Sequence, residues 1–222
     1  RGCFGKLVSY SRFLMLIQKY LVLLTIFVYA YKANEDCIFF IDSTVLRACH
    51  NKRISQNKVF KGVAQRGKSS MGWFYGFKFH YVINSKGEIV KFLITPGNVS
   101  DQNHELVDFL TKNIQGKMFG DKGYISAALF KKLFERGLKI VTKIKRNMKN
   151  VLMDLSDKVL LRKRGVVESV GNLLKNSMQS EHTRYRSIIG LFINVFSAVV
   201  AYNFLEKKPS IVSARMLISS LR

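Results

Sequence analysis

Gly120-Asp121-Lys122-Gly123-Tyr124 is the stretch that decides how this chain is expected to fold. An apolar pair, Met118-Phe119, precedes the acid, and a glycine after it allows a sharp turn. Leucine and phenylalanine then recur at helical spacing over residues 129–134. The pattern predicts a strand, an acid, a turn and a helix. In an α/β sheet, ligands and metals are held at the carboxyl ends of strands, so Asp121 becomes a candidate site residue.

Two further acids have similar apolar surroundings in a chain with only 14 Asp and Glu. Asp42 follows Phe39-Phe40-Ile41, and Glu168 follows Val166-Val167. Singly, each acid has a structural explanation: a cap for Asp42, a basic partner for Asp121, and a helix-surface salt bridge for Glu168. Jointly they favour a metal site, because oxygen ligands suit Mg²⁺ and Mn²⁺. Two such ions support an in-line displacement at phosphorus.

The charge of the chain limits its partners. Lys and Arg number 37 against 14 acids, which gives a net charge of +23. Such an excess is typical of proteins that hold a phosphate backbone, although a ribosomal-type or membrane-surface protein would share it. Nucleic acid is favoured because the basic residues are spread over the chain and not confined to a tail. The acid-free stretch 47–68 fits either a solvated loop or the lining of a nucleic-acid groove.

Cysteine usage and hydropathy exclude several classes. The three cysteines form no C-x-x-C pair, so neither a disulfide framework nor a zinc site is expected, and a reducing cytoplasm fits. The apolar run Phe13–Tyr31 is interrupted by Gln18-Lys19, and its uninterrupted part, Tyr20–Tyr31, predicts a buried helix and no membrane span. The chain begins at Arg1 without an initiator Met, which indicates a fragment or a processed product.

The remaining pattern alternates between strands and helices. A hairpin is predicted from alternating residues on both sides of Asn84-Ser85-Lys86-Gly87. The expected elements are strand Ile38–Thr44, hairpin Trp73–Ile83 with Glu88–Thr95, helix Asn103–Lys112, strand Lys117–Asp121, helix Ser126–Arg136, strand Leu138–Ile144, helix Val166–Met178 and helix Ser187–Leu205. Residues 145–164 are polar and basic and receive no element. This order predicts an α/β fold, a mixed sheet with helices on its faces.

Five motifs also carry a resemblance to a known family. They are Phe40-Ile41-Asp42-Ser43-Thr44, Lys58-Val59-Phe60-Lys61-Gly62, Gly72-Trp73-Phe74-Tyr75-Gly76-Phe77-Lys78, Thr95-Pro96-Gly97-Asn98 and Gly120–Tyr124. Over Val8–Val212 the chain resembles bacterial insertion-sequence transposases of the DDE type, most closely the insertion-sequence family numbered 982. The resemblance implies a ribonuclease-H-like catalytic core that cuts DNA at transposon ends and joins it to a target.

The same resemblance implies roles for individual residues. Asp42, Asp121 and Glu168 would be the catalytic acids and would bind two Mg²⁺ or Mn²⁺ ions. Arg164, Glu168 and Lys175 fit the pattern Tyr-x2-Arg-x3-Glu-x6-Lys of related transposases, while Leu161 stands at the Tyr position. A helix would return Lys175 to the face of Glu168, where it could hold a phosphate. Gly171 departs from a good helix former and should weaken this helix by about 1 kcal/mol.

The full set of expected DNA contacts, domains and partners follows from these points. The DNA-binding residues are expected to be Arg53, Lys58, Lys61, Lys78, Lys122, Lys145, Arg146, Lys149, Arg162, Arg164 and Lys175. Residues 1–35 would be the remnant of an N-terminal helical region, 36–208 the catalytic domain and 209–222 a tail. The partners would be transposon ends and target DNA, with a homodimer in the DNA complex left open, in the bacterial cytoplasm at the nucleoid. A ribonuclease-H-like nuclease without strand transfer and an inactive DNA-binding fragment remain alternatives.

Overall fold

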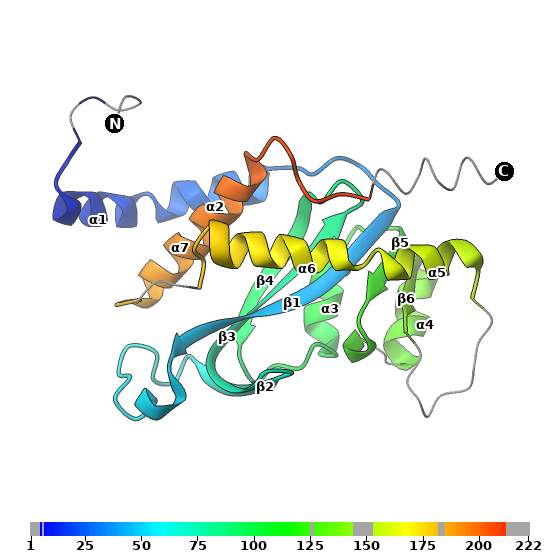
Figure 1. The fold of residues 1–222 in the computed structure, drawn as a ribbon, viewed down its shortest axis with the longest axis horizontal. Coiled ribbons are helices and arrows are strands. Elements are labelled where there is room, and N and C mark those ends of the chain that lie inside the picture. The colour runs from blue at the N-terminus through cyan, green and yellow to red at the C-terminus, as the bar shows by residue number, and fades with distance from the viewer. Residues whose placement is uncertain (1–4, 6, 125–126, 144–152, 182–184, 212–222) are drawn as a thin grey trace.

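The computed structural model describes residues 5, 7–124, 127–143, 153–181 and 185–211. Three of the predicted phosphate contacts, Lys145, Arg146 and Lys149, lie outside these residues. The described chain folds around one mixed sheet with helices on both faces (Figure 1).

The sheet has the strand order β2-β3-β1-β5-β6, and β4 pairs with β3. Its strands are β1 (Ile38–Cys49), β2 (Gln65–Ser69), β3 (Gly72–Asn84), β4 (Ile89–Pro96), β5 (Gly116–Gly120) and β6 (Leu138–Thr142). The pairs β1–β3, β2–β3 and β3–β4 are antiparallel, whereas β1–β5 and β5–β6 are parallel. The predicted hairpin is confirmed as β3 and β4, and its turn carries Gly87 at a φ of 77°, a conformation that glycine adopts readily.

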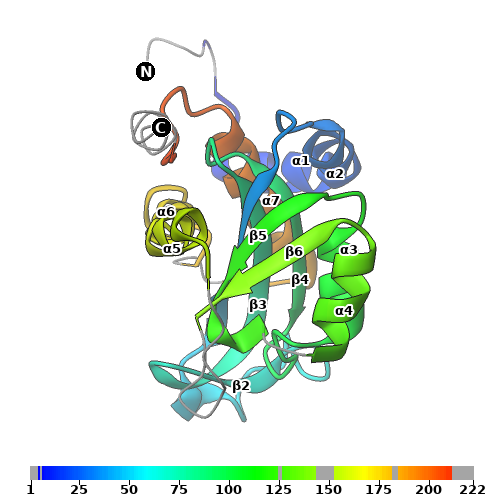
Figure 2. The ribbon, with the colours of Figure 1, turned by 90° about the vertical axis from the view of Figure 1, so that its right-hand side faces the viewer.

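Helices cover the two faces of the sheet, as Figure 2 shows. One face packs against α3 (His104–Thr111) and α4 (Ala127–Glu135), and the other against α5 (Leu155–Arg162), α6 (Gly165–Asn172) and α7 (Ile188–Asn203). Neighbouring residues of β1 divide between the two cores, because successive side chains of a strand point to opposite faces. Phe39 and Ile41 pack with α3 and α4, and Phe40 packs with α6 and α7. The predicted α/β fold class, a mixed sheet flanked by helices, is confirmed.

The N-terminal helices correct one prediction. The apolar run forms α1 (Tyr10–Lys19) and α2 (Leu21–Ala30), and Val28 is the one buried residue of α2. The expected buried helix is therefore wrong: α2 is apolar all round, but only its side toward α7 and Phe92 of β4 is in contact with the rest of the chain. Among the residues described, no single helix is long and apolar enough to cross a membrane. Together α1 and α2 would reach that length, but they are bent by 57°.

Two basic segments contain elements that the sequence pattern did not predict. The stretch 47–68 begins in β1, passes through a short 3-10 helix, η1 (Asn51–Arg53), and ends in β2. The stretch 145–164 contains α5, which an ion-pair cluster fixes to the sheet. Asp157 is fully buried, and its carboxylate receives Lys117 Nζ at 2.6 Å and Lys139 Nζ at 3.1 Å.

Candidate active site

Asp42 lies within β1 and not at its end, because β1 continues past the predicted Thr44 to Cys49. Its strand pairs with β5 only as far as Phe40, opposite Phe119, and then continues to Cys49 beside β3. In that second ladder Asp42 lies opposite Tyr81. By the alternation of β1, its side chain points to the face that Phe40 shares with α6. The side chain is 23% exposed.

Asp121 is the first residue after β5, and its side chain is exposed. The parallel register pairs Phe40 with Phe119, so Asp42 and Asp121 lie two residues further along adjacent strands, at the same level of the sheet. A one-turn 3-10 helix, η2 (Lys122–Tyr124), begins directly after the acid, and Tyr124 N donates to Asp121 O at 3.0 Å. Whether these two acids share a cation stays a prediction.

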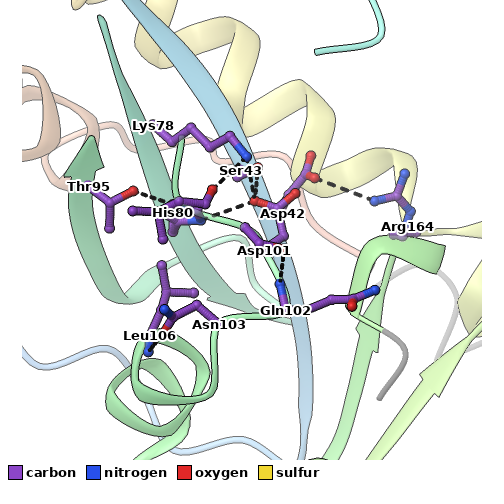
Figure 3. A network of polar contacts seen from close by, with 12 residues as sticks. Asp42, Ser43, Lys78, His80, Thr95, Asp101, Gln102, Asn103, Leu106 and Arg164 are labelled. Atoms are coloured by element: carbon purple, nitrogen blue, oxygen red, sulfur yellow. Dashed lines mark hydrogen bonds and ion pairs between the residues drawn. The ribbon is translucent and has the colours of Figure 1, made fainter. Parts of the chain in front are cut away.

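Glu168 lies on the exposed side of α6 and is linked to Asp42 by an arginine. The guanidinium of Arg164 lies 2.6 Å from Glu168 Oε1 through Nη2, and 3.7 Å from Asp42 Oδ1 through Nη1. Arg164 is only 17% exposed, and Figure 3 shows its position on the far side of Asp42 from Asp101. Two of the three predicted acids are thus brought to one cation, which here is a residue of the chain itself.

A glycine explains how α6 approaches the sheet so closely. Tyr81 Oη donates to the carbonyl of Val167 at 2.8 Å, which ties α6 to β3 directly opposite Asp42. A Cβ at Gly171 would lie 2.5 Å from the same Tyr81 oxygen, so no larger residue fits without movement. The sequence predicted only a weaker helix at this position. The structure supplies the reason for the glycine: it lets the helix that carries Glu168 reach the strand that carries Asp42.

The helix after Gly171 changes its winding before it reaches Lys175. Residues Leu173–Ser177 form a π-helical turn. The prediction that Lys175 returns to the face of Glu168 assumed a regular α-helix, so it does not hold as stated. Lys175 Nζ lies 3.0 Å from Glu181 Oε2, and the other oxygen of Glu181 receives Arg47 Nη1 at 2.9 Å. The structure therefore places Lys175 in an ion pair with Glu181.

The electrostatic surroundings of Asp42 disfavour its charge. Burial raises the pKa of this carboxyl from 3.8 to about 6, and the nearby carboxylates of Glu168 and Asp101 act in the same direction. Arg164 and the backbone amide of Ser43 lower the pKa but do not compensate for burial. A partly buried acid with a strongly perturbed pKa is typical of functional sites. A bound cation would remove this penalty, because it favours the ionised form.

Asp101 is a fourth acid near the site, and the sequence pattern did not identify it as a site residue. Asn103 is the actual cap of α3, since its Oδ1 accepts from Leu106 N at 3.0 Å. Asp101 Oδ1 instead receives the Ser43 hydroxyl at 3.1 Å and Lys78 Nζ at 3.3 Å, as Figure 3 shows. The alternation of Lys78 and His80 along β3 was the available signal, because it predicts two polar residues on one face.

His80 completes this second polar cluster. It is fully buried, its Nε2 lies 2.9 Å from Thr95 Oγ1, and its Nδ1 lies 3.6 Å from Asp101 Oδ1. Burial lowers the pKa of His80 to about 4, and Lys78 adds to the effect. The ring is therefore neutral at pH 7. Lys78, a predicted DNA contact, is only 13% exposed and also donates to Val99 O at 2.9 Å, so its position favours a structural role.

The remaining predicted DNA contacts divide by position. Arg53, Lys58 and Lys61 are exposed between β1 and β2, and Lys122 and Arg162 are exposed on η2 and α5. They are available to a phosphate backbone, and contact with DNA stays a prediction for each.

The donor set suits a hard divalent cation. The described residues contain no group of three or more His, Cys, Asp or Glu side chains already arranged around a metal position. However, the guanidinium of Arg164 lies near both Asp42 and Glu168. Asp121 lies at the same level on the neighbouring strand. Carboxylate oxygens are the ligands that Mg²⁺ and Mn²⁺ prefer, so the residues fit.

Comparison with known proteins concerns this same part of the chain. A protein-family model described as "Transposase DDE domain" matches residues 32–188, more than half of the chain, and this range contains all three acids. A search of curated protein sequences finds no match.

Among solved structures, the chain is similar to the catalytic core domain of BIV integrase, at 11% identity and a TM-score of 0.44, over 85% of this chain and 100% of that one. It is similar to piggyBac transposase in a synaptic complex with hairpin DNA, at 15% identity and a TM-score of 0.47, over 85% of this chain and 52% of that one. It is also similar to the catalytic domain of Mos1 mariner transposase, at 9% identity and a TM-score of 0.30, over 90% and 95%.

Proposed function

This chain belongs to the family of transposase DDE domains, and from that premise we propose that it cuts DNA at the ends of an insertion sequence and joins those ends to a target. The observation that carries the proposal is the convergence of Asp42 and Glu168 on one cationic group, with Asp121 at the same level on the adjacent strand. Isolated acids on three separate elements have no structural need to meet. The approach of two of them to Arg164 supports a site for phosphoryl transfer.

Asp42, Asp121 and Glu168 are the residues that would hold two Mg²⁺ or Mn²⁺ ions. When bound, such ions lower the pKa of an attacking oxygen nucleophile and stabilise the charge that develops on the leaving oxygen. The chain contributes position: β1 and β5 fix two of the acids, and Tyr81 with Gly171 holds α6 at the distance that brings in the third. Fixed placement of the reacting groups supplies a large share of the acceleration in such reactions.

The basic residues would hold the substrate. Lys122 follows Asp121 directly and is exposed, and Arg162 is exposed on the helix before α6. Lys122 is adjacent in sequence to Asp121, and Arg162 precedes Arg164 by two residues, so both are candidates to hold a phosphate at the acids. With a net charge of +23 the chain gains affinity for any DNA by releasing counterions. The acids would then select the phosphate to be attacked, and the basic residues would keep the duplex in place.

The finer assignment is part of the same proposal. We place the chain in the insertion-sequence family numbered 982, and we expect a longer N-terminal helical region to recognise the ends of the element. The apolar α1 and α2 would be the part of that region present in this chain.

A single assay separates the proposal from its alternatives. A labelled duplex with the terminal repeat found beside the gene is incubated with Mg²⁺ and a plasmid target. Joined products support the transposase. Cut products alone would indicate a ribonuclease-H-like nuclease without strand transfer, and bound but intact DNA would indicate an inactive DNA-binding protein.

Two variants sharpen this assay. Asp121→Asn should abolish cleavage while DNA binding remains, since it removes one negative ligand and leaves the basic surface unchanged. Asp108→Asn is the matched control, because Asp108 is a surface acid on α3 that pairs with Lys132 and Arg136. Equal activity of Asp121→Asn and the parent would remove Asp121 from the site.

A further inference from the structure

A basic hollow lies at the end of the sheet beyond the acids. It has a volume of about 430 Å³ and is lined by Asn51 of η1, Arg66 of β2 and Trp73 of β3. This volume is in the range of small-molecule sites. The hollow belongs neither to the acid site nor to the hydrophobic cores, so its lining needs a separate explanation.

Trp73 lines this hollow with an exposed side chain, although tryptophan side chains are usually largely buried. It is 63% exposed, whereas the next residue of β3, Phe74, is fully buried. Because side chains alternate along β3, the Trp73 ring points toward solvent. Lys68 lies opposite it in the β2–β3 ladder and holds its Nζ 5.8 Å from the ring centre, a cation–π contact. The exposed ring and its cation form one unit.

The surroundings of the ring carry a single sign of charge. No acidic residue occurs in the sequence between Asp42 and Glu88. Within residues 47–68 the exposed basic residues are Arg47, Lys52, Arg53, Lys58, Lys61, Arg66 and Lys68. Arg47 is the one of them with an ion pair to an acid among the described residues, through Glu181. An exposed aromatic ring among unpaired cations suits a ligand that combines a flat π-face with negative charge.

Hydrogen bonds hold the hollow in shape. Asn51 Nδ2 donates to the carbonyl of Trp73 at 2.7 Å, which ties η1 to the start of β3. In the turn between β2 and β3, the Ser69 hydroxyl donates to Gly72 O at 3.1 Å and accepts from Met71 N at 3.3 Å. A ligand would therefore meet a preformed surface, and little ordering would be needed on binding.

We propose that Trp73 is a stacking platform for one unpaired DNA base, with Arg66 and Lys68 holding the phosphates beside it. Every base has a π-face, and base–aromatic stacking in a positively charged groove is a common way to hold unpaired nucleotides. The proposal rests on the proposed function in one respect, because it takes the ligand to be DNA.

The distance of Trp73 from the acids indicates which part of the DNA it would contact. Trp73 lies eight residues along β3 from Tyr81, the residue opposite Asp42, which is about 26 Å at about 3.3 Å per residue. The base belongs to the DNA several nucleotides from the cut, either in a single-stranded flank or flipped out of a duplex.

The chain offers its own probe, because Trp73 is its only tryptophan. Its fluorescence is followed while the full chain is titrated, without metal, with an oligothymidylate and with an abasic oligonucleotide of equal length and charge. We expect quenching by the oligothymidylate and an affinity about 5- to 100-fold higher than for the abasic strand. Equal affinity and equal quenching would overturn the stacking site and leave the DNA-binding function intact. Failure of both strands to bind would overturn both proposals.

Variants confirm the assignment by anisotropy of a labelled strand. Trp73→Ala should remove the preference for the base-bearing strand and keep the affinity for the abasic one, and Trp73→Phe should restore part of the preference. Phe134→Ala is the control, because Phe134 is another exposed aromatic residue, on α4. Thermal melting checks that each variant is folded. A preference that survives Trp73→Ala would refute the proposal.

Two further DNAs distinguish the source of the base. A duplex with a single-stranded overhang and a blunt duplex of the same length are titrated against the full chain. Quenching by the overhang alone indicates a frayed or single-stranded flank. Quenching by both indicates a base flipped from the duplex, and quenching by neither contradicts the site.

Discussion

Asp42→Asn should make the metal-free protein more stable at neutral pH. Burial raises the pKa of Asp42 from 3.8 to about 6, so the folded state binds this proton more tightly than the unfolded chain does. The change is about two pKa units, or about 3 kcal/mol at about 1.4 kcal/mol per unit. Above pH 6 the acid is ionised in both states, and the folded state carries the full cost. Below pH 4 it is protonated in both states and the cost disappears.

The assay is thermal unfolding of parent and variant in EDTA between pH 4 and pH 8. For a chain of this length about 3 kcal/mol corresponds to a Tm difference of about 6–12 °C. We expect the variant to melt higher by this order at pH 7.5 and to converge with the parent near pH 4. Comparison of the two proteins at each pH cancels the titration of all other groups.

Two controls make this result specific. Asp108→Asn should shift Tm slightly in the opposite direction, because Arg136 and Lys132 lower the pKa of Asp108. Addition of Mg²⁺ should raise Tm of the parent more than that of Asp42→Asn, since a metal binds the ionised ligand and thereby stabilises the folded state. A variant that melts at or below the parent at pH 7.5, with no dependence on pH, would refute the electrostatic reasoning.

Three other substitutions test the packing and charge of the site. Gly171→Ala should lower the free energy of unfolding, measured in urea, by about 1–3 kcal/mol, because the new methyl group meets the Tyr81 hydroxyl. Tyr81→Phe in the same chain should recover part of this loss. A gain of stability in Gly171→Ala would contradict the contact. Arg164→Gln should lower Tm in EDTA at pH 7.5, and should lower it less at pH 5, where Asp42 is largely protonated. A larger loss at pH 5 than at pH 7.5 would argue against an ion pair between Arg164 and Asp42. Asp157→Asn should lower stability at pH 7 by about 1–3 kcal/mol. Its two lysine partners hold the pKa of Asp157 below its usual value, so this loss should fade as pH falls toward 3, and a constant difference down to that pH would exclude the ion pairs as its cause.

Local pattern predicted much of the fold. The β3–β4 hairpin, α3 and the strand before Asp121 were predictable because turn residues, helical spacing and alternation act within a few residues. The burial of α2 was not predictable in this way. Hydropathy gives the apolar area of a helix, but the partner that covers it is set by the tertiary fold, and α7 covers only one side.

The candidate acids could be chosen from the sequence, but their contacts could not. Asp42, Asp121 and Glu168 were identified from isolated acids next to apolar runs, whereas Asp101 has no such run before it. The β3 strand places Lys78 and His80 beside Asp101, and this approach exists only after the sheet has formed. The bridging position of Arg164 depends in the same way on how closely α6 packs.

If these acids take up Mg²⁺ as proposed, the bridge formed by Arg164 makes that uptake an exchange of one cation for another. Its guanidinium already neutralises part of the charge of Asp42 and Glu168. An incoming Mg²⁺ competes with a resident cation, and its apparent affinity is reduced by the fraction of molecules in which that cation is in place. A nearby phosphate of bound DNA is a natural new partner for the released guanidinium. Metal and DNA should therefore each strengthen the binding of the other, by the same factor.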